Sequence, residues 1–323
     1  MKDMLCTQTS PSKCKSVSPL PAYPPERSFM IIRIRGSKAV AAIDSVGAQL
    51  ISFQDADHKE YIWDQNPAYW SSSSPVLFPM ISNLRPCGTE MEGKMYPLTR
   101  HGVVRYAPFE VTTQTEDSVT FRTTSNEDTL QVYPYPFALY VTFSIAEEAL
   151  HVEMKVENTG NNTMYYHIGG HPAFYCPMNE GEQFTDYELK FPCEETIVSP
   201  VYNIAQQMIL HDHPAQYLDH SDCLPLDHSL FDSDALIFTG LKSPYVSLIH
   251  KETGKGIRFT PENFETLAFW SPIGKNAPFL CIEPWNGTAI WDTDDDVFAH
   301  KKGICTLDAG AKARYGYWIA PEK

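Results

Sequence analysis

The sequence predicts an all-β fold, a sandwich or barrel of many short strands, and three observations carry this prediction. Apolar and polar residues alternate with a period of two in many segments, as they do in strands that bury one face. Long stretches with the 3.6-residue period of an amphipathic helix are absent. The 25 prolines and 17 glycines interrupt the chain every few residues, which is typical of turns between short strands.

The clearest strand covers residues 150–156, which read Leu-His-Val-Glu-Met-Lys-Val. A polar turn follows at residues 158–162, and residues 163–167 return as a second strand. In chain order, the same alternation predicts further strands at residues 39–43, 50–53, 119–122, 141–145 and 266–270.

Composition excludes several classes of function. The 25 basic and 40 acidic residues give a net charge of −15, which disfavours nucleic-acid and anionic-membrane partners. The 8 cysteines are scattered and form no C-x-x-C pair, so we expect reduced thiols rather than a zinc ribbon or a thioredoxin motif. No apolar run approaches the ~20 residues of a membrane span, and the first residues lack the apolar stretch of a secretory signal. We therefore expect a cytoplasmic protein.

The first 27 residues differ from the rest of the chain. They are rich in Ser, Pro, Thr and Lys, and such a segment buries too little apolar surface to offset its ordering entropy. We predict a disordered tail over residues 1–27 and a single domain over residues 28–323, because no second shift in composition marks another boundary.

Three segments place titratable residues among apolar residues, glycines and prolines. The first is residues 79–85, followed by Arg100-His101-Gly102. The second is residues 168–174, with the sequence Ile-Gly-Gly-His-Pro-Ala-Phe. The third is residues 278–287, with the sequence Pro-Phe-Leu-Cys-Ile-Glu-Pro-Trp-Asn-Gly.

Glu283 and His171 are the main candidates for acid–base chemistry. Desolvation among the apolar neighbours of Glu283 makes a carboxylate a better base, and a histidine exchanges a proton near neutral pH. Gly169 and Gly170 permit a close approach to a ligand or unusual dihedral angles. The alternatives are a structural pair of Glu283 with an arginine and a hydrogen bond of His171 to a backbone carbonyl, and residue pattern alone leaves them open.

Metal binding has little support. His167 and His171 are four residues apart, but that spacing places them on one face only in a helix, which the glycine pair and Pro172 disfavour. The acidic run at residues 292–296 lacks the spacing of an EF-hand, so we interpret it as a solvated loop. We expect neither a metal nor an organic cofactor.

In this order, the three segments resemble the aldose 1-epimerase family, and the resemblance extends from about residue 30 to the C-terminus. It is closest to the lactose-operon-associated, mutarotase-like branch. The resemblance implies a large antiparallel β-sandwich that interconverts the α and β anomers of a sugar. The implied site residues are Glu283 as general base, His171 as general acid, and His101, Arg85 and Asp234 as contacts to the sugar. Beside them, we expect Trp285 to stack on the apolar face of the sugar, with packing in the core as the alternative.

Two departures from the family bear on the substrate. Galactose mutarotases have asparagine before the acid histidine and glutamine soon after the base glutamate, whereas this chain has Gly170 and the pair Pro284-Trp285. Galactose is therefore not implied as the sugar. The position of the sugar-binding aspartate is also open between Asp234 and Asp232.

Other functions remain open. His101-Gly-Val-Val-Arg105 is similar to a motif of hexose-6-phosphate epimerases, in which Arg105 would contact the phosphate. A surface ion pair is the alternative that we favour for Arg105. A non-catalytic carbohydrate-binding module needs no matched acid and base, and a glycoside hydrolase needs two carboxylates across the cleft. We expect a sugar as the partner, with the protein a monomer or a homodimer.

Overall fold

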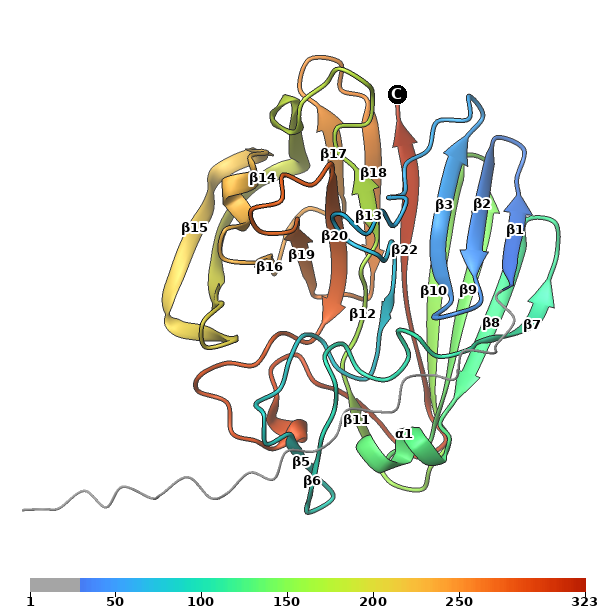
Figure 1. Cartoon of the computed structure of the whole chain (residues 1–323), viewed down its shortest axis with the longest axis vertical. Helices are drawn as coiled ribbons and strands as arrows, with labels where there is room; N and C mark the ends of the chain where they lie inside the picture. The colour runs from blue at the N-terminus through green and yellow to red at the C-terminus, as the bar shows by residue number, and fades with distance from the viewer. Residues whose placement is uncertain (1–29) are drawn as a thin grey trace, which may run out of the picture.

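The computed structural model describes residues 30–323. The tail predicted for residues 1–27 lies outside this part of the chain. The described chain is built almost entirely of antiparallel strands, which confirms the predicted all-β sandwich. Figure 1 shows the strands arranged in stacked sheets.

The large sheet has nine strands in the order β15-β14-β17-β18-β22-β10-β9-β8-β7. Their bounds are β7 Glu110–Gln114, β8 Ser118–Thr124, β9 Phe137–Ala146, β10 Ala149–Asn158, β14 Tyr187–Asn203, β15 Met208–Pro225, β17 Val246–His250, β18 Gly256–Glu262 and β22 Lys312–Glu322.

A six-stranded sheet carries the candidate site. It has the order β16-β19-β20-β12-β4, and β13 also pairs with β20. The bounds are β4 Val76–Leu77, β12 Ile168–Gly170, β13 Ala173–Tyr175, β16 Leu236–Thr239, β19 Thr266–Trp270 and β20 Phe279–Asn286.

The remaining elements are small. A three-stranded sheet packs on β8, β9 and β10 (Figure 1) and consists of β1 Ile31–Arg35, β2 Ala39–Asp44 and β3 Gln49–Asp55. Two antiparallel pairs are the hairpin of β5 Thr89–Met91 with β6 Lys94–Tyr96, and the long-range pair of β11 Met164–Tyr166 with β21 Cys305–Leu307. The helical segments are α1 Glu127–Val132 and the short 3-10 turns η1 Phe184–Asp186, η2 His228–Phe231 and η3 Phe298–His300. None of these helices has the length and apolar character needed to cross a membrane.

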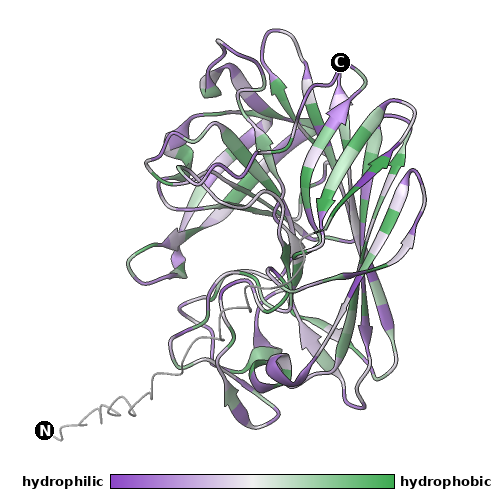
Figure 2. Ribbon diagram, turned by 45° about the vertical axis from the view of Figure 1, so that its right-hand side comes forward, coloured by the Kyte–Doolittle hydropathy of each residue, from purple (hydrophilic) through white to green (hydrophobic). Residues whose placement is uncertain are grey.

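Strand alternation decides which side chains enter the core. In β10, every second residue from Leu150 to Val156 is buried, and the polar residues between them are partly exposed. Figure 2 shows this alternation as green and purple bands along the strands. The predicted strands at residues 39–43, 50–53, 119–122, 141–145, 150–156, 163–167 and 266–270 all coincide with strands of the structure.

Strand β20 has no polar face, because both of its faces are covered. Leu280 and Ile282 belong to the main core, whereas Phe279 and Cys281 belong to a second apolar cluster on the opposite face. A strand covered on both faces reads as a continuous apolar run. The period-two pattern therefore does not reveal this strand, although Glu283 lies in it.

Candidate active site

A cavity of about 260 Å³ lies against the six-stranded sheet, and we call it the inner cavity. It brings together residues that are far apart in the sequence. Its walls come from β20, the end of β12, the long β14, the turn after η2 and the loop at residues 100–105. The lining residues are Trp70, Ser82, Arg100, His101, Arg105, His171, Tyr202, Asp234, Ala235, Ile237, Trp270, Glu283, Trp285 and Ala289.

Glu283 reaches the inner cavity because of its position in β20. Residues 279, 281, 283 and 285 share one face of the strand, since side chains alternate in direction. On this face Phe279 and Cys281 pack into an apolar cluster, whereas Glu283 and Trp285 line the cavity. The carboxylate is only 1% exposed. Its Oε2 atom has no hydrogen-bond partner among the described residues.

His171 is brought to Glu283 by the packing of two glycines. A Cβ on Gly169 would lie 2.8 Å from the carbonyl oxygen of Pro284, and one on Gly170 would lie 3.0 Å from the ring of Tyr317. The glycines therefore admit neighbouring protein atoms rather than a ligand, and neither has a positive φ angle. The N–H of His171 then donates to the carbonyl of Pro75 at 3.1 Å, which fixes the backbone.

The two side chains form a close pair. Nε2 of His171 lies 3.3 Å from Oε2 of Glu283, which is within ion-pair distance. The His171 ring stacks on Trp70, with centroids 4.8 Å apart, and meets the edge of Trp270 at 5.5 Å. Its Nδ1 atom has no hydrogen-bond partner among the described residues. The aromatic rings hold the imidazole in place beside the carboxylate of Glu283.

Burial shifts both pKa values toward the uncharged forms. Burial, and then the nearby charge of Asp234, raises the pKa of Glu283 well above its usual value, against the opposing effects of Arg100, Trp285 and Arg105. Burial, and then the charge of Arg105, lowers the pKa of His171 well below its usual value. Both shifts favour the uncharged forms, so burial disfavours an ion pair of ionised Glu283 and protonated His171.

Asp234 rather than Asp232 lines the inner cavity. It follows η2 with a φ of 75°, and its N–H donates to the carbonyl of Phe231 at 3.0 Å. Burial raises the pKa of this carboxyl group, and the charge of Arg100 acts against the shift.

His101 contacts donors at both ring nitrogens. Nδ1 faces the N–H of Ser82 at 3.3 Å, and Nε2 faces Nε of Arg100 at 3.2 Å. Burial, and then the charge of His171, lowers the pKa of His101 well below its usual value. A neutral imidazole accepts at only one nitrogen. Hence only one of the two contacts is a hydrogen bond at a time, and Arg100 is free to turn toward a ligand when His101 accepts from Ser82.

Comparison with known proteins identifies the family to which this chain belongs. The model of the aldose 1-epimerase family matches residues 30–293. The chain belongs to the aldose 1-epimerase family.

Individual relatives agree with this membership. The LacX proteins of Lactococcus lactis subsp. lactis, plasmid and chromosomal, are 34% identical over 281 residues, which cover 85% of this chain and 94% of theirs. A galactose mutarotase related enzyme from Lactobacillus acidophilus has a TM-score of 0.86 at 29% identity, covering 91% of this chain and 98% of its own. A galactose mutarotase-like protein from Lactobacillus casei has a TM-score of 0.79 at 28% identity, covering 91% of this chain and 100% of its own.

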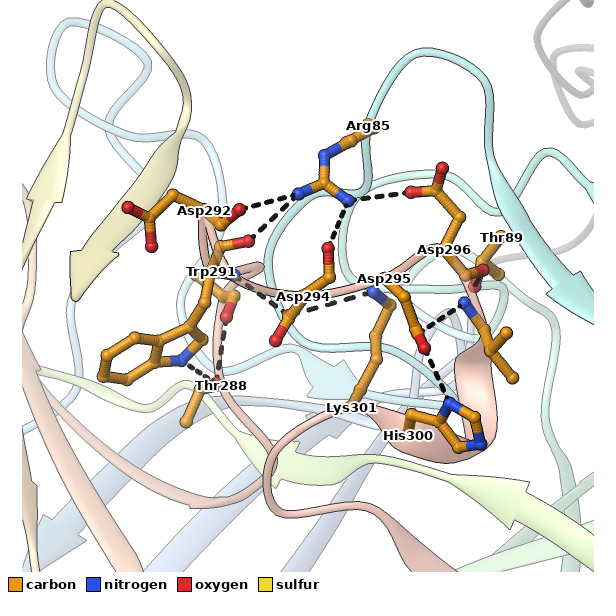
Figure 3. Close-up of polar contacts among 12 residues, drawn as sticks. Arg85, Thr89, Thr288, Trp291, Asp292, Asp294, Asp295, Asp296, His300 and Lys301 are labelled. Atoms are coloured by element: carbon orange, nitrogen blue, oxygen red, sulfur yellow. Dashed lines mark hydrogen bonds and ion pairs between the residues drawn. The ribbon is translucent and has the colours of Figure 1, made fainter. Parts of the chain in front are cut away.

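Arg85 is the exception among the residues that the family resemblance implied. Its guanidinium lies outside the inner cavity and donates to the carbonyl of Asp294 and to Oδ1 of Asp296, both at 2.8 Å. It also reaches the carbonyls of Trp291 and Asp292 at 3.3 Å (Figure 3). These acceptors occupy the side chain, so the prediction that Arg85 binds the sugar is not supported by its position.

The acidic run at residues 292–296 is a paired loop rather than a freely solvated one. Asp292 bonds His211 at 2.9 Å, Asp295 bonds His300 at 2.8 Å, and Asp296 bonds Arg85. Figure 3 shows Asp296 directed toward Arg85 and Asp295 directed toward His300. The loop is partly exposed, as the prediction of a solvated loop requires, and its ion pairs also connect it to neighbouring segments.

Two arginines do line the inner cavity of this epimerase-family chain, Arg100 and Arg105. Sequence reasoning noted Arg100 within the first motif but did not select it, because nothing in the pattern separates it from Arg85. The surface ion pair favoured for Arg105 is absent among the described residues. Its Nε has no partner, and its guanidinium lies 5.9 Å from the ring centroid of Trp70.

Two groups of side chains have the composition of metal ligands. Donor atoms of His171, Cys281 and Glu283 all lie within 4.8 Å of one another, as do those of the partly exposed group His211, Asp212 and Asp292. The first group has a zinc-like ligand set, but it includes the close acid–base pair. His167 belongs to neither group, so it does not join His171 in a metal site there.

Proposed function

We propose that this protein is an aldose 1-epimerase that interconverts the α and β anomers of a sugar. The observation that carries the proposal is the buried pair of Glu283 and His171, with Oε2 and Nε2 3.3 Å apart on the wall of the inner cavity. The ring oxygen and the anomeric hydroxyl of a sugar are both bonded to C1. Two adjacent proton-exchanging groups are therefore suited to serve both oxygens together.

The reaction needs only proton transfers. Glu283, as the carboxylate, takes the proton of the C1 hydroxyl while the C1–O5 bond breaks and O5 takes a proton from His171. The ring opens to an aldehyde, and rotation about C1–C2 presents the other face of the carbonyl. In closure, O5 attacks C1 and returns its proton to His171, and Glu283 gives its proton to the carbonyl oxygen. Each positioned transfer contributes about 10²–10⁴-fold.

The active form has Glu283 ionised and His171 protonated. It arises from the uncharged pair by movement of the one shared proton, without exchange with solvent. Arg100 and Arg105 favour the carboxylate at Glu283. We assign hydroxyl binding to Arg100, His101, Asp234 and Trp285, and we expect Trp70 and Trp270 to cover the ring.

Anomer exchange measured by polarimetry and NMR tests the proposal. Glu283→Gln and His171→Asn keep approximate side-chain size but remove the proton exchange, so kcat should fall by about 10²-fold or more while the sugar still binds. Parental kcat in both variants at saturating sugar would overturn the mechanism. Binding without turnover by the parent protein would instead support a non-catalytic carbohydrate-binding module.

A phosphorylated hexose is a second candidate substrate, and one observation favours it. Arg105 is partly buried at the inner cavity, and its Nε has no hydrogen-bond partner among residues 30–323. An arginine binds phosphate through paired N–H donors. If the substrate is a hexose 6-phosphate, the KM for glucose 6-phosphate should lie well below that for glucose. Arg105→Ala should remove this difference. Equal KM values in the parent protein would leave the neutral sugar as the substrate.

A further inference from the structure

A third buried side chain, Cys281, lies beside the acid–base pair and has no role in the proposed reaction. Its Sγ atom, one ring nitrogen of His171 and one carboxylate oxygen of Glu283 all lie within 4.8 Å of one another. The three residues are 0%, 7% and 1% exposed in that order. A thiol, an imidazole and a carboxylate are the three ligand types that zinc binds in proteins.

Paired strands decide where these three donors lie. Cys281 and Glu283 are two residues apart in β20, so their side chains point to the same side of the strand. Ala173 pairs with Cys281, and the N–H of Ile282 donates to the carbonyl of Pro172 at 3.1 Å. The chain that leaves His171 therefore runs alongside the strand that carries the other two donors.

The donors of this group have few competing partners. Oε2 of Glu283 has no hydrogen-bond partner among residues 30–323, and neither has Nδ1 of His171. Cys281 is a free cysteine. Burial, and then the charge of Glu283, raises the pKa of its thiol well above the usual value. A bound dication would offset the charges of a thiolate and a carboxylate in this buried place.

The spacing of the donors suits a tetrahedral ion after a small movement. With the usual bond lengths of zinc, tetrahedral nitrogen, oxygen and sulfur ligands are about 3.3–3.6 Å apart. Nε2 of His171 and Oε2 of Glu283 already meet this spacing at 3.3 Å. The Sγ atom of Cys281 needs to approach by no more than about 1.2 Å. The inner cavity borders His171 and Glu283 and has room for a water as the fourth ligand.

We propose that His171, Cys281 and Glu283 bind Zn²⁺, and that the bound ion inhibits the enzyme. The inhibition rests on the proposed epimerase function. A lone pair that is bound to the ion cannot take up a proton, so His171 and Glu283 cannot serve the oxygens of the sugar while the ion is present. The ion is an inhibitor rather than a cofactor, because the proposed reaction needs only proton transfers.

Titration of the full chain with Co²⁺ tests the site without any sugar. Co²⁺ accepts the same tetrahedral ligands as Zn²⁺, and a thiolate ligand gives it a charge-transfer absorption band in the near ultraviolet. We expect this band in the parent protein, its loss on addition of Zn²⁺, and its absence in Cys281→Ala. Cys176→Ala is the matched control, because Cys176 is also 0% exposed but does not belong to the donor group. This variant should keep the band.

Anomer exchange of glucose and galactose, measured by NMR, tests the inhibition. Zn²⁺ should inhibit exchange in the parent protein, and EDTA should restore it. Cys281→Ala retains the acid–base pair, so its metal-free kcat should stay within threefold of the parent, while the Zn²⁺ concentration for half inhibition should rise at least tenfold. His211→Asn removes a ligand from the other group of metal-binding composition and should leave the inhibition unchanged.

The outcomes separate the metal site from the proposed function. Equal inhibition of the parent and Cys281→Ala, or no inhibition of the parent, would overturn the inference and leave the epimerase in place. A Co²⁺ band that persists in Cys281→Ala would also overturn it. If the parent exchanges the anomers of neither sugar but shows a band that depends on Cys281, the proposed function and the inhibition fail, whereas the metal site stands.

Discussion

Glu283 and His171 are ordinary residue types that acquire their chemistry from burial. Each has an atom without a hydrogen-bond partner among the described residues, and the pKa of each is shifted toward the uncharged form. Such coupled groups titrate as a pair with apparent pKa values that belong to neither residue alone. In the proposed mechanism, a proton moves within this pair when the sugar reacts.

The pH dependence of turnover follows from these shifts. Loss of activity on the acid side requires a second proton on the pair, and the lowered pKa of His171 places this limb below pH 6.5. Loss on the alkaline side requires removal of the shared proton, and the raised pKa of Glu283 places that limb well above pH 4.5. We expect a bell-shaped profile of kcat/KM with a broad maximum around neutral pH. A flat profile between pH 5 and 9 would contradict the assignment.

His167 provides a separate prediction about stability. Burial, and then the charge of Lys301, lowers its pKa from 6.5 to about 3 in the folded protein. The unfolded chain binds the proton first, so stability is fully present above pH 6.5 and is lost as the pH falls toward 3. At about 1.4 kcal/mol per pKa unit, this one group should cost about 2 kcal/mol between pH 7.5 and 5.

Urea unfolding at pH 7.5 and 5 measures this contribution. His167→Gln cannot take up a proton, so the difference between the two pH values should shrink by about 2 kcal/mol relative to the parent. His213→Gln, at an exposed position of β15, is the control. The prediction fails if the two variants show the same difference.

At the scale of elements, β12 and β20 assemble the acid–base pair. Gly169 pairs with Trp285 and also with Leu77, so β12 is held on both edges. The close approach of these strands decides the distance between His171 and Glu283. Gly169 and Gly170 of this three-residue strand thus permit the close packing because they have no side chains.

Gly169→Ala should therefore reduce activity through position alone. The added Cβ would lie 2.8 Å from the carbonyl oxygen of Pro284 and from Cδ1 of Trp285, and the strands must separate. We expect kcat to fall at least tenfold. In Gly274→Ala, the Cβ would have no neighbour within 4 Å at a φ of 65°, so this control reports backbone strain without crowding. Equal kinetics in both variants would contradict the positioning role.

Substitution of Arg85 should lower the stability of the loop at residues 291–296, whereas substitution of Arg100 should weaken sugar binding. Arg85→Ala removes several hydrogen bonds to residues 291–296, and we expect a loss of about 2–3 kcal/mol of unfolding free energy. Arg100→Ala should raise KM about tenfold with little loss of stability, since its partner His101 also has the Ser82 N–H available. A larger rise of KM in Arg85→Ala than in Arg100→Ala would restore Arg85 as the sugar ligand.

The whole molecule supplies a rigid support for a cleft made mostly of loops. One main apolar cluster contains residues from the large sheet, from β1 to β3 and from β20. The hairpin of β14 and β15 has several register shifts and bends, and its length carries Tyr202 and Ile204 to the cleft. The sheets therefore fix the positions from which the loops extend.

We expect residues 1–27 to add nothing to the stability of the whole domain. Residues 1–27 have a composition that offers little apolar surface for packing. Deleting them should leave the melting temperature within about 2 °C and anomer exchange unchanged. Thermal unfolding and NMR exchange of the shortened chain provide the measurement. A fall of many degrees would show that the segment packs on the domain.

Sequence alone determined the class of the fold and the strands with one exposed face. Residues 150–156 alternate because one side of β10 meets the core and the other meets water. The motif residues Glu283 and His171 were also accessible from sequence, since titratable groups among apolar neighbours and glycines are unusual enough to select.

Only the tertiary structure decided the rest, because it depends on which distant segments meet. Strand β20 shows no period-two pattern, because both of its faces pack in apolar clusters. The sequence does not distinguish Arg100 from Arg85, whereas the structure shows that Arg85 donates to the carbonyls of Asp294 and Trp291. The choice of Asp234 over Asp232 depends on a single turn after η2. A sequence records the composition of each segment, but burial and distance between segments set the pKa values and the contacts of a site.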